Sequence, residues 1–201
     1  MAEVEHAIDV ADEDQLRANC YALLGRLLAC APDAQTLAMV GNLTGDSSDF
    51  GRALSALSSA ARSASQQSLE EEYFNLFIGV GQGELTPYGS YYMTGFLHEK
   101  PLAALRADMG RLGIARVEGV SEPEDHIAAL CEMMAGLITG AFADPGDLAT
   151  QREFFEKHLA PWAPRFFEDL QATRSAAFYM PVGRIGQLFM EVEKQAFDMT
   201  A

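Results

Sequence analysis

The feature that most constrains the fold is the helical spacing of apolar residues that follows the acidic stretch 121–126. Beyond Ile127, apolar side chains recur every three or four residues, at Leu130, Cys131, Met134, Leu137, Ile138 and Ala141. This spacing gives a helix one apolar face for about four turns, and such a face packs against a core. No segment shows a convincing alternation of apolar and polar residues typical of a half-buried strand. The sequence therefore predicts an all-α fold.

The start of this helix is predicted at Ser121. Ser121 and Glu124 have the spacing of a capping box, and Pro123 suits a first turn, where a backbone amide has no helical partner. The helix dipole favours negative charge at this end, so stabilisation of the helix alone explains Glu122, Glu124 and Asp125. A binding role for the same residues is the alternative.

Further helices follow from the same periodicity. They are predicted over 12–29 with Asp12 or Asp14 as cap, around 37–43, over 50–68, over 69–78, over 101–112 and over 162–170. One more helix is predicted to end near residue 161, and the last helix to begin near residue 178. At 201 residues the chain fits a single globular helical domain of about eight to ten helices. Residues 1–11 are expected to be disordered, and residues 113–120 to form a hinge between two helical halves.

Composition narrows the choice of partners. The chain has 14 Lys and Arg against 29 Asp and Glu, a formal net charge of -15, so it repels nucleic acid and anionic membranes and attracts basic partners. No apolar run reaches the roughly 18 residues that a membrane span requires. The acidic N-terminus is the opposite of a signal peptide, whose first residues are basic. We therefore expect a cytoplasmic protein without stable membrane insertion.

Motifs for catalysis or metal binding are missing from the sequence. The four histidines show no H-x-x-x-H spacing and the three cysteines no C-x-x-C spacing. The glycines of 79–83 lack a preceding strand and the Lys of a phosphate-binding loop. We predict no catalytic residue, no metal and no cofactor. The alternative is a small metal- or nucleotide-dependent hydrolase using Asp125 and His126, although adjacent residues of a helix point about 100° apart.

A cluster of tyrosines suggests a binding groove. Tyr88, Tyr91 and Tyr92 follow a loop rich in Gly and Pro, and their hydroxyls need partners when buried. Such a combination suits a groove for an extended or helical apolar peptide, and acidic residues beside it would attract arginine.

Three motifs together resemble a known family. They are Glu72-Tyr73-Phe74-Asn75-Leu76-Phe77-Ile78-Gly79, Pro87-Tyr88-Gly89-Ser90-Tyr91-Tyr92 and Glu122-Pro123-Glu124-Asp125-His126. In this order they resemble the TorD/DmsD/NarJ family of redox-enzyme maturation chaperones. The resemblance spans most of the chain and is weakest over 33–68.

The resemblance implies an all-helical, non-catalytic, cytoplasmic chaperone. Family members recognise the twin-arginine signal peptide of a molybdenum-cofactor oxidoreductase and delay export of its apo-form until the cofactor is inserted. It implies peptide-binding residues at Tyr73, Leu76, Phe77, Pro87, Tyr88, Tyr92, Glu122, Pro123, Asp125 and His126. Two guanidinium groups followed by an apolar segment would match an acidic turn beside an aromatic groove.

The identity of the client stays open between dimethyl sulfoxide or trimethylamine oxide reductase, formate dehydrogenase, nitrate reductase and others. A leader-independent assembly adaptor is a further alternative. For the chain itself we expect a monomer that converts to a domain-swapped homodimer through the hinge at 113–120.

Overall fold

The computed structural model describes residues 11–116, 119, 122–142 and 145–199. These residues form ten α-helices and one π-helical turn, and no strand beyond an isolated bridge between Tyr88 and His126. The all-α prediction is confirmed. The elements are α1 (Asp12–Ala29), α2 (Ala34–Gly41), α3 (Asp49–Ser63), α4 (Gln66–Tyr73), the π-turn η1 (Phe74–Ile78), α5 (Gly89–Thr94), α6 (Lys100–Arg111), α7 (Ile127–Thr139), α8 (Leu148–His158), α9 (Ala163–Ala172) and α10 (Tyr179–Met199).

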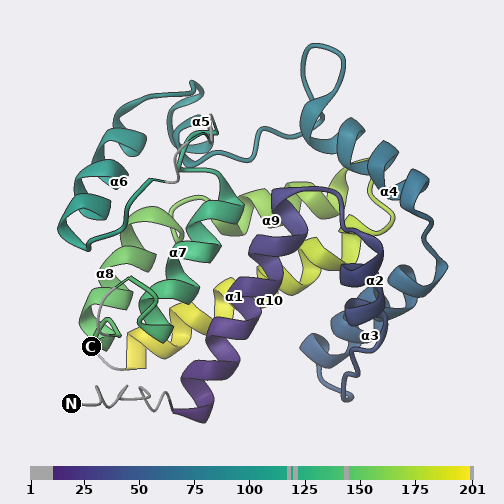
Figure 1. The fold of residues 1–201 in the computed structure, drawn as a ribbon, viewed down its shortest axis with the longest axis horizontal. Coiled ribbons are helices and arrows are strands. Elements are labelled where there is room, and N and C mark those ends of the chain that lie inside the picture. Colours follow the sequence, from purple (N-terminus) through teal and green to yellow (C-terminus); the bar gives the residue numbers. More distant parts are fainter. Residues whose placement is uncertain (1–10, 117–118, 120–121, 143–144, 200–201) are drawn as a thin grey trace, which may run out of the picture.

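Helices from the two ends of the chain cross the middle of the molecule (Figure 1). There α1 packs against α7, and α10 packs against α9 and α3. The helices α2, α3 and α4 lie on one side of this centre, and α5, α6, α7 and α8 lie on the other (Figure 1). Elements that precede and follow residue 113 are therefore interleaved, and they share one hydrophobic core.

Close contact between α1 and α7 depends on Gly25. A Cβ atom at this position would lie 3.0 Å from the Glu132 Cγ and 3.2 Å from the Ala128 carbonyl oxygen. Both distances are tighter than most Cβ contacts in proteins, so a larger residue here would require Glu132 and the α7 backbone to shift by a few tenths of an ångström. The apolar face predicted for α7 is buried, with the exception of Ala141, which lies beyond the end of the helix and is exposed.

A buried ion pair joins the first and last helices. Arg17 donates from Nε to Glu193 Oε1 at 2.7 Å and from Nη2 to Oε2 at 2.9 Å, and the Tyr21 hydroxyl donates to Oε2 at 2.9 Å. Glu193 is fully buried, so loss of Arg17 would leave an unpaired charge in the core. Burial lowers the pKa of Arg17, but the Glu193 carboxylate outweighs this effect and the pKa is raised.

The motif that begins at Glu72 holds helix ends in place. The Glu72 carboxylate accepts from the backbone N–H groups of Ala177, Phe178 and Tyr179 at 2.8 to 3.1 Å, at the N-terminus of α10. The Tyr73 hydroxyl donates to the Ala29 carbonyl at 2.9 Å, at the C-terminus of α1. Both side chains thus pair backbone groups that a helix end leaves without partners.

The central helix starts later than predicted. It begins at Ile127 with His126 as N-cap, so residues 122–126 form a turn before the helix, not its first turn. Ser121 lies outside the described residues. Glu124 is not the capping residue, because its carboxylate forms ion pairs with Arg106 and Arg116.

Three other predictions on helices need correction. The N-cap of α1 is Ala11, without a side-chain hydrogen bond, instead of Asp12 or Asp14. The helix predicted over 50–68 breaks at Ala64, because Ser65 and Ser68 form a capping box that starts α4. The short α5, which carries Tyr91 and Tyr92 directly after the loop rich in Gly and Pro, was not predicted.

Disorder was predicted for residues 1–11, of which 1–10 lie outside the described residues and Ala11 is the N-cap of α1. Residues 117–118 and 120 of the predicted hinge also lie outside them. At the near end of that segment Gly113 has a φ of 72°, a left-handed conformation that favours glycine. Ile114 is buried, and its N–H donates to the Met109 carbonyl at 2.9 Å.

Among the described helices, none combines the length and apolar character needed to cross a bilayer.

Candidate functional site

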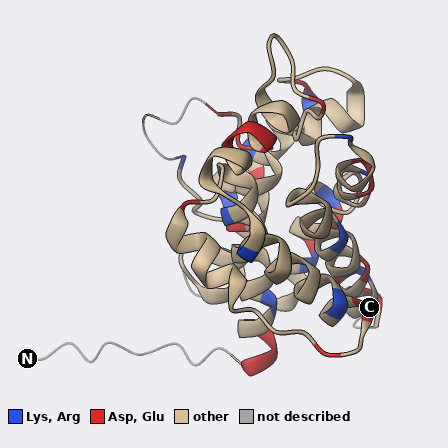
Figure 2. Ribbon diagram, turned by 90° about the vertical axis from the view of Figure 1, so that its right-hand side faces the viewer, with Lys and Arg blue, Asp and Glu red and all other residues tan. Residues whose placement is uncertain are grey.

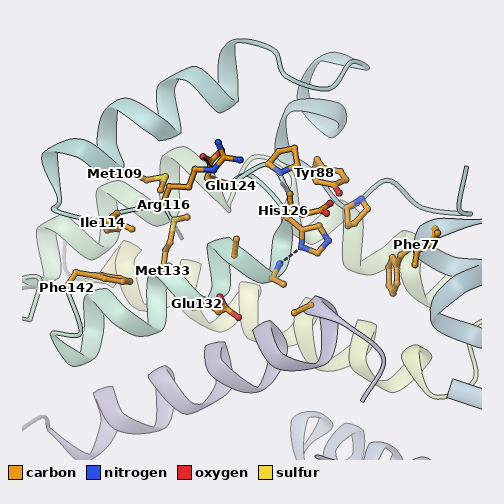
Figure 3. A pocket seen from close by; sticks show the side chains of 18 of the residues that line it. Phe77, Tyr88, Met109, Ile114, Arg116, Glu124, His126, Glu132, Met133 and Phe142 are labelled. Atoms are coloured by element: carbon orange, nitrogen blue, oxygen red, sulfur yellow. Dashed lines mark hydrogen bonds and ion pairs between the residues drawn. The ribbon is translucent and has the colours of Figure 1, made fainter. Parts of the chain in front are cut away.

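A cavity of about 610 Å³ is bounded by α4, η1, α6, α7 and the turn 122–126 (Figure 3). Its walls are mainly aromatic and aliphatic, with a few charged groups among them. The lining residues are Ala29, Tyr73, Phe77, Ile78, Pro87, Tyr88, Met109, Ile114, Ala115, Arg116, Glu122, Pro123, Glu124, His126, Ala128, Ala129, Glu132, Met133 and Phe142. A cavity of this size and composition is typical of a ligand-binding site.

Aromatic packing fixes one end of the cavity. The Phe77 ring lies 5.0 Å from the Tyr73 ring and 5.4 Å from the Tyr179 ring, measured between centroids. Tyr179 is fully buried, and its hydroxyl donates to the Leu27 carbonyl at 3.0 Å. Phe77 is therefore held from behind by α10 while it lines the cavity.

The second and third motifs meet along the backbone. The N–H of Gly89 donates to the Asp125 carbonyl at 2.9 Å, and the N–H of Ile127 donates to the Pro87 carbonyl at 2.9 Å. This pairing places the Tyr88 ring against the His126 ring, with 5.1 Å between centroids, and Figure 3 shows both at the cavity wall. The order of the motifs in the sequence gave no indication of this direct contact.

His126 combines a structural role with a place in the cavity wall. Its Nδ1 accepts from the N–H of Ala128 at 3.1 Å, which caps α7. Since Nδ1 is an acceptor, the neutral ring carries its proton on Nε2. Burial lowers the pKa of His126 from 6.5 to about 4, so the ring is neutral at pH 7.

Asp125 faces away from the cavity. The carboxylate is buried, and its Oδ2 accepts from the N–H of Ser90 at 2.7 Å, in the first turn of α5. Asp125 and His126 therefore have separate partners on two different helices. Across the described part of the chain, no group of three or more His, Cys, Asp and Glu residues could hold a metal ion.

Glu124, the most buried carboxylate that lines the cavity, already pairs with two arginines of the protein. Arg106 contacts Glu124 Oε2 through Nε at 2.9 Å and Nη2 at 2.8 Å, and Arg116 Nε lies 3.2 Å from Oε1. Burial raises the pKa of Glu124, but the hydrogen bond and charge of Arg106 outweigh it and the pKa is lowered. Glu124 is already neutralised within the protein and needs no external cation.

The cavity brings together seven of the ten predicted binding residues, and three lie elsewhere. The seven are Tyr73, Phe77, Pro87, Tyr88, Glu122, Pro123 and His126. Besides Asp125, the outliers are Leu76, which is fully buried in the core, and Tyr92. Tyr92 packs on Trp162 with 5.4 Å between ring centroids, and its hydroxyl donates to Asp169 at 3.2 Å.

Sequence reasoning missed several lining residues. Met133 and Glu132 lie beside the predicted apolar face of α7, and the spacing of 126, 129, 132 and 133 on one helical face could have indicated them. Met109 and Phe142 reach the cavity only through tertiary packing (Figure 3). No local pattern in the sequence marks them.

Known proteins resemble this chain along much of its length. The chain is 27% identical to the "Chaperone protein TorD" of Vibrio cholerae over 144 residues, which are 68% of this chain and 66% of that protein. It is 30% identical to the "Tat proofreading chaperone DmsD" of Salmonella typhi over 138 residues, which are 68% of this chain and 65% of that protein. The matches thus span just under two thirds of these relatives' own length. Their names describe chaperones, not enzymes, as the sequence resemblance implied.

The fold has a counterpart among solved structures. A protein from Archaeoglobus fulgidus, described as a redox enzyme maturation protein, superposes on this chain with a TM-score of 0.58 at 20% sequence identity. The superposition covers 94% of this chain and 99% of the Archaeoglobus chain. A family model described as "Nitrate reductase delta subunit" matches residues 44–168, which is more than half of the chain. The chain therefore belongs to the nitrate reductase delta subunit family, the TorD/NarJ family that its three motifs resemble.

Proposed function

We propose that this protein is a maturation chaperone that binds the twin-arginine signal peptide of a molybdenum-cofactor oxidoreductase in the cavity. It holds the apo-form of that client back from export until the cofactor is inserted. The relatives named as chaperones support the general role, and the cavity supports the mode of binding.

One observation carries the proposal most strongly. The three motifs are separated in the sequence, yet residues from all three line the same cavity. Its apolar walls suit the apolar segment of a signal peptide, with a gain of about 25 cal/mol per Å² of apolar surface buried. The net charge of -15 favours approach of a basic leader. Figure 2 shows acidic residues on several elements, including the first turn of α1.

The test is a calorimetric titration with a synthetic peptide that carries two arginines followed by an apolar segment. Phe77→Ala should lower its affinity about tenfold, in the range typical for loss of an aromatic contact at an interface. Phe74→Ala is the matched control, because Phe74 lies on the same π-turn, is exposed and does not line the cavity. We expect the control to bind like the unmodified protein.

Melting temperatures of both variants should be measured in parallel, since Phe77 also contacts buried rings. A peptide whose apolar residues are replaced by serine should bind weakly to the unmodified protein. If the unmodified protein captures the folded client but ignores the peptide, the leader-independent adaptor is the better description, and the proposal fails.

A further inference from the structure

A second cavity adjoins the first at Glu132. This second cavity, of about 580 Å³, is formed by the C-terminus of α1, residues 30–33, the start of α2 and α7. It shares Ala29 and Glu132 with the first cavity. Figure 3 shows Glu132 on the side of α7 that faces α1. An extended ligand could therefore occupy both and pass Glu132 on the way.

The two cavities differ in chemical character. The first combines aromatic, methionine and aliphatic side chains with the charged residues Arg116, Glu122, Glu124 and Glu132. The second is lined by small residues together with Arg26, Asp33 and Thr36. Arg26 donates from Nε to the Thr36 hydroxyl at 2.8 Å, and its Nη2 lies 4.0 Å from Asp33. Large apolar side chains suit the aromatic and methionine walls of the first cavity, and small or polar side chains suit the second, which has no aromatic residue in its lining.

Glu132 is the carboxylate best placed to receive a guanidinium from a ligand. Glu124 is neutralised by two arginines and Asp125 caps α5, whereas no ion pair involves Glu132 within the described ranges. Glu132 is exposed where the two cavities adjoin, and the burial of part of its side chain raises the pKa of its carboxyl group. A cationic ligand that pairs with Glu132 would relieve this unfavourable desolvation.

We propose that Glu132 binds an arginine of the signal peptide and sets the direction of the peptide across the two cavities. This inference rests on the proposed function. In a signal peptide the basic residues precede the apolar segment. With an arginine at Glu132, the apolar segment enters the first cavity and the residues before the arginines extend into the second, towards Cys30 and Asp33. Glu122, an exposed residue on the rim of the first cavity, is available to the other arginine.

Affinity measurements test the contact. Glu132→Gln should bind the twin-arginine peptide about three- to tenfold more weakly, and its affinity should depend less on salt concentration. Glu191→Gln makes the same charge change at an exposed site on α10 that lines neither cavity, and should leave the affinity unchanged. Replacing the peptide arginines by glutamine should weaken binding to the unmodified protein more than to Glu132→Gln, as coupled partners require.

Cys30 provides a test of direction, because it is exposed and lines the second cavity. One peptide carries an activated disulfide before the arginines, and another carries it after the apolar segment. We expect the first to label Cys30 faster, with Cys30→Ser as the control against reaction at Cys20 or Cys131.

The outcomes separate the two proposals. No peptide binding to the unmodified protein would overturn the proposed function and this inference together. Normal peptide binding with equal affinity for Glu132→Gln would overturn the contact while the proposed function stands. Faster labelling from the position after the apolar segment would overturn the direction.

Discussion

Asp125 belongs to the most recognisable motif of the chain, yet its carboxylate supports a neighbouring helix. It accepts from the N–H of Ser90, while its own carbonyl accepts from Gly89. These contacts fix the backbone that carries Tyr88 to the cavity wall. We therefore interpret Asp125 as a positioning residue that acts on the cavity through Tyr88.

Substitution of Asp125 should affect stability before it affects peptide affinity. In Asp125→Ala the buried N–H of Ser90 loses its acceptor, and we expect the free energy of unfolding to fall by about 1–3 kcal/mol. Asp125→Asn retains an acceptor oxygen and should lose less. Urea unfolding and peptide titration of both variants give the comparison. Unchanged stability of Asp125→Asn with a salt-dependent loss of affinity would instead indicate direct contact with arginine.

His126 should make the protein less stable in mild acid. Burial lowers the pKa of the folded-state ring from 6.5 to about 4. Above pH 6.5 the ring is neutral in both states and the cap of α7 is complete. As the pH falls towards 4 the unfolded chain binds a proton that the folded chain does not, so stability is lost, by up to about 3 kcal/mol.

The measurement is the free energy of unfolding of the unmodified protein and of His126→Asn between pH 7.5 and about 3.5. Asparagine can cap a helix but does not titrate in this range. The difference between the two curves should decline from pH 6.5 and level off below pH 4. A constant difference across the range would show that His126 is not the titrating group.

At the scale of elements, local patterns predicted most helices, and tertiary contacts decided where several of them start. The apolar spacing of α7 was sufficient to identify it, but its start was misplaced because the S-x-x-E pattern has the form of a capping box. Glu124 instead pairs with arginines that lie 18 and eight residues earlier in the sequence. The family resemblance pointed to seven of the residues that line the cavity. Met109 and Phe142 could not be predicted, because only packing of α6 and the end of α7 brings them to the cavity.

The anchoring of α10 by Glu72 gives a prediction at this scale. Glu72→Ala would remove the acceptor of three backbone N–H groups at the start of α10, and we expect a loss of about 2–4 kcal/mol in the free energy of unfolding. Glu71→Ala is the matched control, because Glu71 is exposed on the same helix and accepts only from Gln67. It should change the stability by no more than about 0.5 kcal/mol. Urea unfolding of both variants measures the two losses. An equal loss of unfolding free energy in Glu71→Ala and Glu72→Ala would contradict the capping role of Glu72.

At the scale of the whole molecule, the predicted hinge divides the chain into halves that cannot be separated in space. The contacts of α1 with α7 and of α10 with α3 cross the division. The cavity crosses it as well, since Phe77 and Tyr88 precede the hinge while His126 and Met133 follow it. A dimer that exchanged halves at 113–120 would rebuild each cavity from two chains and keep the same contacts.

Exchange of halves therefore predicts complementation between two defective variants. Phe77→Ala damages the cavity before the hinge, and Met133→Ala damages it after the hinge. If the two are partly unfolded, mixed at high concentration and refolded, a mixed swapped dimer contains one cavity with both substitutions and one with neither. Random pairing would then restore full peptide affinity in about a quarter of all cavities of the dimer fraction.

Titration of that fraction after size-exclusion chromatography measures the restored sites, and each variant refolded alone is the control. A mixed dimer without restored sites would mean that the chains associate through their surfaces and that residues 113–120 do not act as a hinge.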